Sequence, residues 1–275
     1  MKPLDFEYDG QYLSDYGFVV CEFNANGGIS EASAASKIVF EKAARNNGTK
    51  YSLTRTKYTE CLTSTFDICK NPDIYDGEDL KVTADEFRDI MRWLNRKEFL
   101  PFRFITDEGL VQDIETCHHN ASFNVTRLML DEILYGIRLT METDAPFGHG
   151  AERAYSWSAT SANKTKVISD ISDEIGYIYP VIDIKCKQDC DFVITNESEG
   201  CSSTIMNCKA GEVITMHGDT NIITTSYADH DINNDFNYEF FRIGNTADRI
   251  ENIITVSHPC DIVMRYCPII KCAQL

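Results

Sequence analysis

The residues of this chain most able to do chemistry are its thiols, imidazoles and carboxylates. Its 275 residues include eleven cysteines, six histidines and 43 acidic residues. The triplet Cys117, His118 and His119 comes nearest to a metal site. Neighbouring residues of a strand point to opposite faces, so these three side chains cannot easily reach one ion. We therefore expect packed or solvated side chains here, and neither a metal site nor a catalytic base.

The cysteines gather in the second half of the chain, where seven of the eleven lie between Cys186 and Cys272. Cys186 and Cys190 are four residues apart, Cys201 and Cys208 are seven apart, and no CxxC pair is present. These spacings do not match a zinc knuckle. The odd number of cysteines and the lack of an apolar signal segment at the start favour reduced thiols over a disulfide framework. We expect ordinary buried or surface thiols, with a metal site or disulfides as alternatives.

The motifs of the common enzyme classes are missing from the sequence. It contains no GxxxxGK[ST] or GxGxxG phosphate loop, no GxSxG elbow and no HExxH. The many carboxylates could supply a glycosidase pair, but such residues pair in space and no spacing singles out two of them. The sequence therefore gives no catalytic, cofactor-binding or metal-binding residue. We expect a protein without a cofactor that is not an enzyme.

The chain carries a formal charge of −17, and both halves are acidic. Proteins that bind nucleic acid stably do so mainly through Lys and Arg, and anionic membranes attract the same residues. The charge therefore excludes both of these as ordinary partners. With 43% hydrophobic residues the chain is long enough to build a core, and it has no apolar run of membrane-spanning length.

One helix stands out among the elements that must position these residues. Thr83 and Glu86 form a capping-box pair, and Pro101 sets the latest end of the helix. Apolar residues follow the cap at helical spacing and predict its core face: Phe87, Ile90, Met91 and Leu94.

Alternating apolar residues predict strands through most of the remaining chain. In the first half they cover residues 51–59, 64–70, 102–105, 110–115, 122–130 and 135–141. In the second half they cover residues 179–184, 191–195, 212–216, 221–226, 252–257 and 262–266. A small, polar composition over residues 145–165 marks the expected boundary. We predict a mainly β protein with one clear helix: a mixed α+β domain over residues 1–150 and a β-sandwich over residues 151–275.

Several motifs recur in a fixed order. They are FEYDG and SDYGFVV between Phe6 and Val20, Trp93-Leu94 before LPFRF at 100–104, GIRLTM at 136–141 before DAPF at 144–147, FRIGN at 241–245, NIITV at 252–256 and MRYCP at 264–268. In this order the chain resembles the distal tail proteins of long-tailed bacteriophages. The chain departs from the family in two ways. The spacing from Gly244 to Asn252 is longer than the Gly-x-Asn of the family, and the cysteines in the C-terminal half of this chain have no assigned role in the family.

The resemblance implies a structural protein of the virion tail, assembled in the bacterial cytoplasm of a phage or prophage host. Members of this family have an N-terminal belt domain, here residues 1–150, and a C-terminal galectin-like β-sandwich, here residues 151–275. Six copies close into a ring, which joins the tail tube and tape measure to the tail tip, or baseplate, and the receptor-binding proteins. DNA passes through the ring without being bound.

A closed ring needs an interface between copies, and edge pairing of strands is one way to build it. The strands at 51–59 and 64–70 carry Thr, Lys and Arg on one face. This face could be a subunit contact or a solvated sheet face, and the sequence favours neither. An acidic lumen would repel phosphates. We therefore predict that four acidic residues before the helix face the channel or its rim: Asp73, Asp76, Glu78 and Asp79. The alternative is that they lie in an ordinary solvated loop.

Two other functions stay open. The sandwich could bind carbohydrate, with Trp157 or with Tyr177 and Tyr179 as stacking platforms, although tyrosines at such positions also pack in cores. A virion-associated glycoside hydrolase is the second alternative, and the missing motifs count against it.

Overall fold

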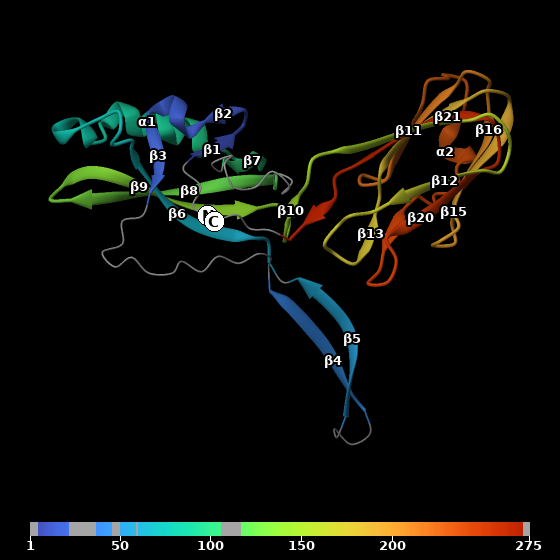
Figure 1. The fold of residues 1–275 in the computed structure, drawn as a ribbon, viewed down its shortest axis with the longest axis horizontal. Coiled ribbons are helices and arrows are strands. Elements are labelled where there is room, and N and C mark those ends of the chain that lie inside the picture. Colours follow the sequence, from blue (N-terminus) through green and yellow to red (C-terminus); the bar gives the residue numbers. More distant parts are fainter. Residues whose placement is uncertain (1–4, 22–36, 46–49, 59, 106–116, 272–275) are drawn as a thin grey trace. The chain divides into compact units, whose positions relative to one another are not determined.

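The computed structural model describes residues 5–21, 37–45, 50–58, 60–105 and 117–271. The chain divides into two compact units, which we call unit 1 (residues 1–150 with 270–275) and unit 2 (residues 151–269). Most of the described elements are strands (Figure 1). The strand expected at 110–115 lies outside the described residues. Among the described residues no helix has the length and apolar character needed to cross a membrane.

Unit 1 is built on a seven-stranded antiparallel sheet with the order β2-β1-β7-β8-β9-β6-β3. Its strands are β1 (Asp5–Tyr8), β2 (Gln11–Tyr12), β3 (Phe18–Cys21), β6 (Thr63–Lys70), β7 (Leu100–Ile105), β8 (His119–Leu130) and β9 (Ile133–Thr143). Two short 3-10 turns also belong to the unit: η1 (Leu13–Tyr16) between β2 and β3, and η2 (Gly77–Leu80) after β6. The strands expected at 64–70, 102–105, 122–130 and 135–141 all lie in this sheet.

Helix α1 (Ala84–Leu94) belongs to unit 1 and begins at the expected cap. The Thr83 side chain accepts a hydrogen bond from the Glu86 amide, and the Glu86 carboxylate accepts one from the Thr83 amide at 2.8 Å. The helix turns Phe87, Ile90 and Leu94 into the core, and half-buried Met91 packs against it. The cap and the apolar stripe together explain why these eleven residues form a helix.

Trp93 anchors the same helix, although it is not part of the predicted stripe. Its indole lies parallel to the ring of Phe6 at 5.5 Å and to that of Tyr16 at 4.6 Å. Its Nε1 donates a hydrogen bond to the carbonyl oxygen of Tyr8 at 3.0 Å. A buried Trp needs such a partner for its N–H group. The first hairpin and the helix are therefore joined through one side chain.

The described chain also contains three two-stranded sheets. Strands β4 (Ile38–Arg45) and β5 (Lys50–Tyr58) pair with each other, β10 (Gly148–His149) pairs with β22 (Ile269–Ile270), and β13 (Gly176–Ile178) pairs with β19 (Ile243–Asn245). The sequence predicted β5 but not its partner β4.

Unit 2 is a β-sandwich of two antiparallel sheets. One sheet has the order β11-β21-β14-β17-β18 and the other β12-β20-β15-β16. Their strands are β11 (Arg153–Ala159), β12 (Lys164–Ser169), β14 (Val181–Cys186), β15 (Cys190–Asn196), β16 (Cys201–Cys208), β17 (Val213–His217), β18 (Ile222–Thr225), β20 (Glu251–Val256) and β21 (Cys260–Tyr266). Buried residues of both sheets, among them Ile184 and Ile194, form one core cluster. A short helix, α2 (Ile232–Asp235), also belongs to this unit.

Strand β11 lies inside the segment that the sequence marked as a polar boundary. Tyr155 and Trp157 alternate with exposed Ala154, Ser156 and Ser158, and the strand pairs with β21 along its length. Because β11 belongs to an antiparallel sheet that packs only one face into the sandwich, its other face meets water and tolerates small polar residues. The small polar residues on the outer face are the reason why the sequence did not predict this strand, although its inward positions carry aromatic rings.

Candidate functional site

The ribbon formed by β4 and β5, which we call the arm, is the first candidate interaction site. In the described part of the chain these two strands pair only with each other (Figure 1). The register shifts between Glu41 and Lys42, because Arg55 faces Glu41 and Leu53 faces Lys42. Thr54 is therefore an extra residue, and its hydroxyl donates to the Glu41 carbonyl at 3.0 Å. A bulge of this kind changes which side chains share a face.

The bulge gathers apolar side chains on one face of the arm, which also carries Lys42 and Thr56; we call it the apolar face. Directly opposite residues of a strand pair share a face, as do residues two apart along a strand. Ile38, Phe40, Tyr51, Leu53 and Tyr58 fall on the same face by this register. The exposed fractions of Phe40, Tyr51 and Leu53 are 55%, 66% and 57%. The other face carries the ion pair between Lys57 and Glu41, at 2.6 Å.

An exposed apolar ribbon is unusual on a protein surface that is in contact with water. A two-stranded hairpin has little stability alone in water, and apolar patches of this kind mark interaction sites. At its base, Tyr58 packs edge-on against Phe147 with ring centroids 4.9 Å apart. The arm is thus attached at one end, and it offers a partner its apolar face and two strand edges that no described strand pairs with.

The acidic loop of unit 1 lies between β6 and α1 and includes η2. It holds all four residues predicted for the channel or rim, and all four are exposed: Asp73, Asp76, Glu78 and Asp79. Glu78 forms an ion pair with Lys81. The Asp73 amide donates to the Asn71 side chain at 2.9 Å. The structure thus brings the four carboxylates to one solvated loop, and where that loop lies in an assembly stays a prediction.

The base of this loop is held by a buried cation. Lys70 Nζ lies 2.8 Å from a Glu86 carboxylate oxygen and 4.4 Å from the centre of the Tyr75 ring. Burial acts to raise the pKa of Glu86, but its hydrogen bonds with Lys70 and Thr83 outweigh burial and lower it. Gly17 leaves room for Tyr75, because a Cβ there would lie 2.6 Å from the tyrosine oxygen.

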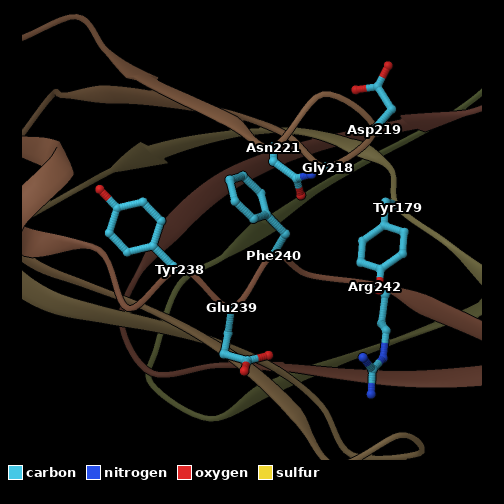
Figure 2. A pocket seen from close by; sticks show the side chains of 8 residues that line it. All are labelled: Tyr179, Gly218, Asp219, Asn221, Tyr238, Glu239, Phe240 and Arg242. Atoms are coloured by element: carbon cyan, nitrogen blue, oxygen red, sulfur yellow. The ribbon is translucent and has the colours of Figure 1, made fainter.

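A pocket of about 380 Å³ opens in unit 2 (Figure 2). It is lined by Tyr179, Gly218, Asp219, Asn221, Tyr238, Glu239, Phe240 and Arg242. Gly218 permits this arrangement, since a Cβ there would lie 2.8 Å from the Cβ of Tyr179 and clash. The rings of Tyr179 and Tyr238 border the hollow.

The charged side chains of the pocket do not converge on one point. The carboxylates of Asp219 and Glu239 point to opposite sides in Figure 2. The Arg242 guanidinium lies over the Tyr177 ring at 4.4 Å, and its hydrogen bond with Tyr179 raises the pKa of Arg242. The arrangement is a polar hollow with an aromatic border, and it gives no support to a carboxylate pair acting on a glycosidic bond. Trp157, the other expected platform, is half-buried against the core.

In the Cys117, His118 and His119 triplet the first and third side chains are buried and the second is half-buried. The Cys117 sulfur lies 3.4 Å from His119 Nε2 and both residues are buried, whereas His118 pairs through its backbone with His149. Burial lowers the pKa of His119 to about 4, so its imidazole is neutral near pH 7. In the described ranges no group of three or more candidate ligands could hold a metal ion.

A buried amide cluster in unit 2 connects the two ends of the stretched Gly-to-Asn motif. The Gly244 amide donates to Asn252 Oδ1 at 2.7 Å, and Asn252 Nδ2 donates to the Gly244 carbonyl at 3.0 Å. Asn196 Nδ2 donates to the same Asn252 oxygen at 2.8 Å. A Cβ at Gly244 would collide with the Glu199 carboxylate. The longer spacing thus leaves Gly244 and Asn252 in contact.

Comparison with known families gives the chain its place. A family model described as the phage tail protein N-terminal domain matches residues 1–145, more than half of the chain. A second model, described as the phage tail C-terminal domain, matches residues 147–266. The chain belongs to this family of phage tail proteins. The tail protein is therefore a component of the virion tail.

The fold agrees with a solved structure from a phage. The tail protein is similar to the crystal structure of the Dit protein (gp 19.1) of phage SPP1, described as a paradigm of the hub adsorption apparatus in phages that infect Gram-positive bacteria. The TM-score is 0.65 at 14% sequence identity, and the match covers 97% of this chain and 99% of that one. Among curated proteins no match was found. The predicted resemblance and the mainly β fold with one clear helix are confirmed.

Proposed function

We propose that this tail protein is the hub of the tail end, a homo-hexameric ring between the tail tube and the tail tip with its receptor-binding proteins. Membership in the phage tail family and the fold shared with SPP1 Dit support this role. Residues 1–150 would form the ring as a belt domain, and residues 151–269 would form a docking sandwich of the galectin-like type. Its work is mechanical, without catalysis or cofactor.

The single observation that carries the proposal is the exposed apolar face of the arm. A ring needs a head-to-tail interface in which one patch meets a different patch of the next copy. The arm supplies such a patch, because Phe40, Leu53 and Tyr51 lie on one side of a ribbon with open edges. Seating this face on the neighbouring copy would remove the three side chains from water, at about 25 cal/mol per Å² of apolar surface.

The charge of the chain fits a protein that lets DNA pass. Stable DNA binding needs cations that neutralise phosphates, and this chain has 26 basic against 43 acidic residues. We place Asp73, Asp76, Glu78 and Asp79 at the channel or its rim, where repulsion keeps phosphates from adhering. If these residues map to the outer perimeter of the ring, the channel assignment is wrong.

Charged substitutions on the arm test the ring. Phe40→Asp and Leu53→Asp place a carboxylate on the apolar face, so sedimentation equilibrium is expected to show monomers in place of hexamers. Ala43→Asp is the matched control, because Ala43 is exposed on the opposite face of the same strand. Hexamers that survive both apolar-face substitutions would contradict the arm as the interface.

Carbohydrate binding by unit 2 is the second candidate function, favoured by the pocket between Tyr179 and Tyr238. Aromatic faces beside amide and carboxylate groups suit the apolar face and hydroxyls of a sugar. A glycan array with the wild type and with Tyr179→Ala and Tyr238→Ala tests it. Binding that both substitutions abolish supports this function, and the absence of any bound glycan counts against it.

A further inference from the structure

Three thiols lie together at one end of the unit 2 core. Cys186 ends β14, Cys190 begins β15 and Cys208 ends β16. Cys190 lies directly opposite Cys208 in the pairing of β15 with β16. Cys186 is in hydrogen-bonding contact with both. All three are free thiols in this structure.

The backbone holds Cys190 and Cys208 at a separation that a disulfide can span. Directly opposite residues of an antiparallel pair have Cα atoms about 4.5–5.5 Å apart. Disulfides occur at Cα separations of about 4.4–6.8 Å. Closing a bond between these two cysteines therefore requires side-chain rotation and no rearrangement of the sheet.

A β-bulge fixes this register. Cys190 faces Cys208, whereas Phe192 faces Ile205, so β16 has one residue more than β15 over this stretch. Asn207 adopts a left-handed φ of 59°, and its amide donates to Asp191 Oδ1 at 2.9 Å. Asn tolerates this conformation better than most residues. The bulge thus sets Cys208 beside Cys190.

Access to the three thiols differs. Cys186 and Cys208 are buried, with exposed fractions of 1% and 0%. Cys190 is only half-buried. A reagent from solution therefore meets Cys190 first, and the buried pair can react only with a sulfur already in the cluster.

We propose that Cys190 and Cys208 form a dithiol–disulfide site, with Cys190 as the attacking thiol, Cys208 as the resolving thiol and Cys186 as a positioning residue. The oxidant is a small-molecule disulfide such as glutathione disulfide. A tail protein meets such oxidising conditions when the particle leaves the reducing cytoplasm in which it was assembled.

The reaction proceeds in two exchanges. The Cys190 thiolate attacks one sulfur of glutathione disulfide, which forms a mixed disulfide and releases one glutathione thiolate. The Cys208 thiolate then attacks the Cys190 sulfur, forms the protein disulfide and releases the second glutathione thiolate. The two protein thiols lose two protons and two electrons, and glutathione disulfide is reduced to two glutathiones.

The surroundings divide the two roles. The Cys186 thiol donates to the Cys208 sulfur, which lowers the pKa of Cys208 and raises that of Cys186. Burial raises the pKa of Cys190 to about 11. The first exchange is therefore slow at neutral pH, and its rate rises roughly tenfold per pH unit as Cys190 ionises. The resolving thiol, Cys208, has a lowered pKa and ionises more readily.

The bond would secure an edge of the sandwich. Among the described strands of its sheet β16 comes last, next to β15. A covalent link between the two strands closes the chain from Cys190 to Cys208 and reduces the freedom of the unfolded chain. The oxidised protein is therefore expected to melt at a higher temperature than the reduced protein.

The test treats the full-length protein with glutathione disulfide at pH 9, blocks remaining thiols with an alkylating reagent and maps disulfides by mass spectrometry without reduction. The expected product is a Cys190–Cys208 disulfide. Cys208→Ser should trap glutathione on Cys190, and Cys190→Ser should leave Cys208 reduced. Cys186→Ser should slow the second exchange but still give the same bond.

Cys267→Ser is the matched control, because Cys267 is an exposed thiol of the same unit and its loss should leave the Cys190–Cys208 bond unchanged. Circular dichroism of each variant confirms folding, and the wild-type map stands on its own if a variant fails. A wild type whose Cys190 stays reduced would overturn the proposal. So would stable glutathione on Cys190 without resolution, or a bond between Cys186 and Cys260, which also lie opposite each other.

Discussion

Units 1 and 2 both bury large cores, but they fill them with different side chains. In unit 1 the Phe6 ring lies 5.5–6.0 Å from the rings of Phe66, Trp93, Phe102 and Phe123. Unit 2 fills its core mainly with isoleucines, with fewer phenylalanines, cysteines and methionines among them, and adds buried polar groups such as Asn252 and Glu212. One core is held by rings around a helix and the other by two sheets and an internal polar network.

The arm of unit 1 and the buried amide cluster of unit 2 show a second difference. Unit 1 leaves an apolar ribbon exposed, with Phe40 and Leu53 open to water. The described part of unit 2 satisfies its buried amides internally, through Asn196 and Asn252. In the proposed ring the apolar face of the arm would be covered by another copy, whereas the amides of Asn196 and Asn252 already have their partners within unit 2. Each of the following predictions tests one side of this contrast.

The largest expected effect is in the aromatic core of unit 1. Phe6→Ala removes a fully buried ring and should cost about 3–5 kcal/mol of unfolding free energy. Because the cores are separate clusters, calorimetry should show the transition of unit 1 falling while that of unit 2 stays. Val167→Ala, at a half-exposed position of β12, should change neither. Equal shifts of both transitions after Phe6→Ala would show that the units unfold as one.

Asn252→Ala should produce the next largest effect, and in unit 2. The substitution leaves the Gly244 amide, its carbonyl and the Asn196 side chain buried without this partner, at a cost of about 3 kcal/mol. Chemical denaturation of the variant measures the loss. Thr220→Ala, at an exposed position, serves as the control. A loss below about 1 kcal/mol would mean that water replaces the amide.

A smaller effect should follow pH in unit 2. His230 Nδ1 lies 2.5 Å from Glu212 Oε1, and its Nε2 lies 3.3 Å from Asp235. Burial opposes both charges. For His230 the hydrogen bond with Glu212 outweighs burial and raises the pKa, and for Glu212 the hydrogen bonds with Thr225 and His230 outweigh burial and lower the pKa.

The two pKa shifts determine how the stability of unit 2 changes with pH. The contribution of His230 is complete below its ordinary pKa of 6.5 and is lost as pH rises through the raised value. That of Glu212 is complete above 4.5 and is lost as pH falls through the lowered value. Unit 2 should therefore be most stable near pH 5–6, in thermal melts across pH, and His230→Gln should flatten the upper side of the profile. An unchanged profile in that variant would assign the dependence to other groups.

Much of the fold follows from local pattern. The Thr83–Glu86 cap and the apolar stripe gave the helix, and period-two alternation gave most of the large strands. Trp93 was outside that stripe, because its burial depends on Phe6 and Tyr8, which lie far away in sequence. Strand β4 and the bulge at Thr54 were also out of reach, since the register of a ribbon depends on its partner.

The candidate sites were less predictable than the fold. The four acidic residues of the loop could be named, but their place in a ring depends on other copies of the chain. The pocket joins Tyr179 to Tyr238 and Arg242 across some sixty residues, so no local motif marks it. The spacing of Cys186 and Cys190 was visible, whereas the pairing of Cys190 with Cys208 required the register of β16.

The central claim is that copies of unit 1 complete one another in a ring. Native mass spectrometry of the wild-type protein, with negative-stain images of the same sample, tests this most directly. If the ring forms, the sample contains a particle of six chains of 31.2 kDa each with a hole at its centre. A protein that stays monomeric at high concentration would contradict it.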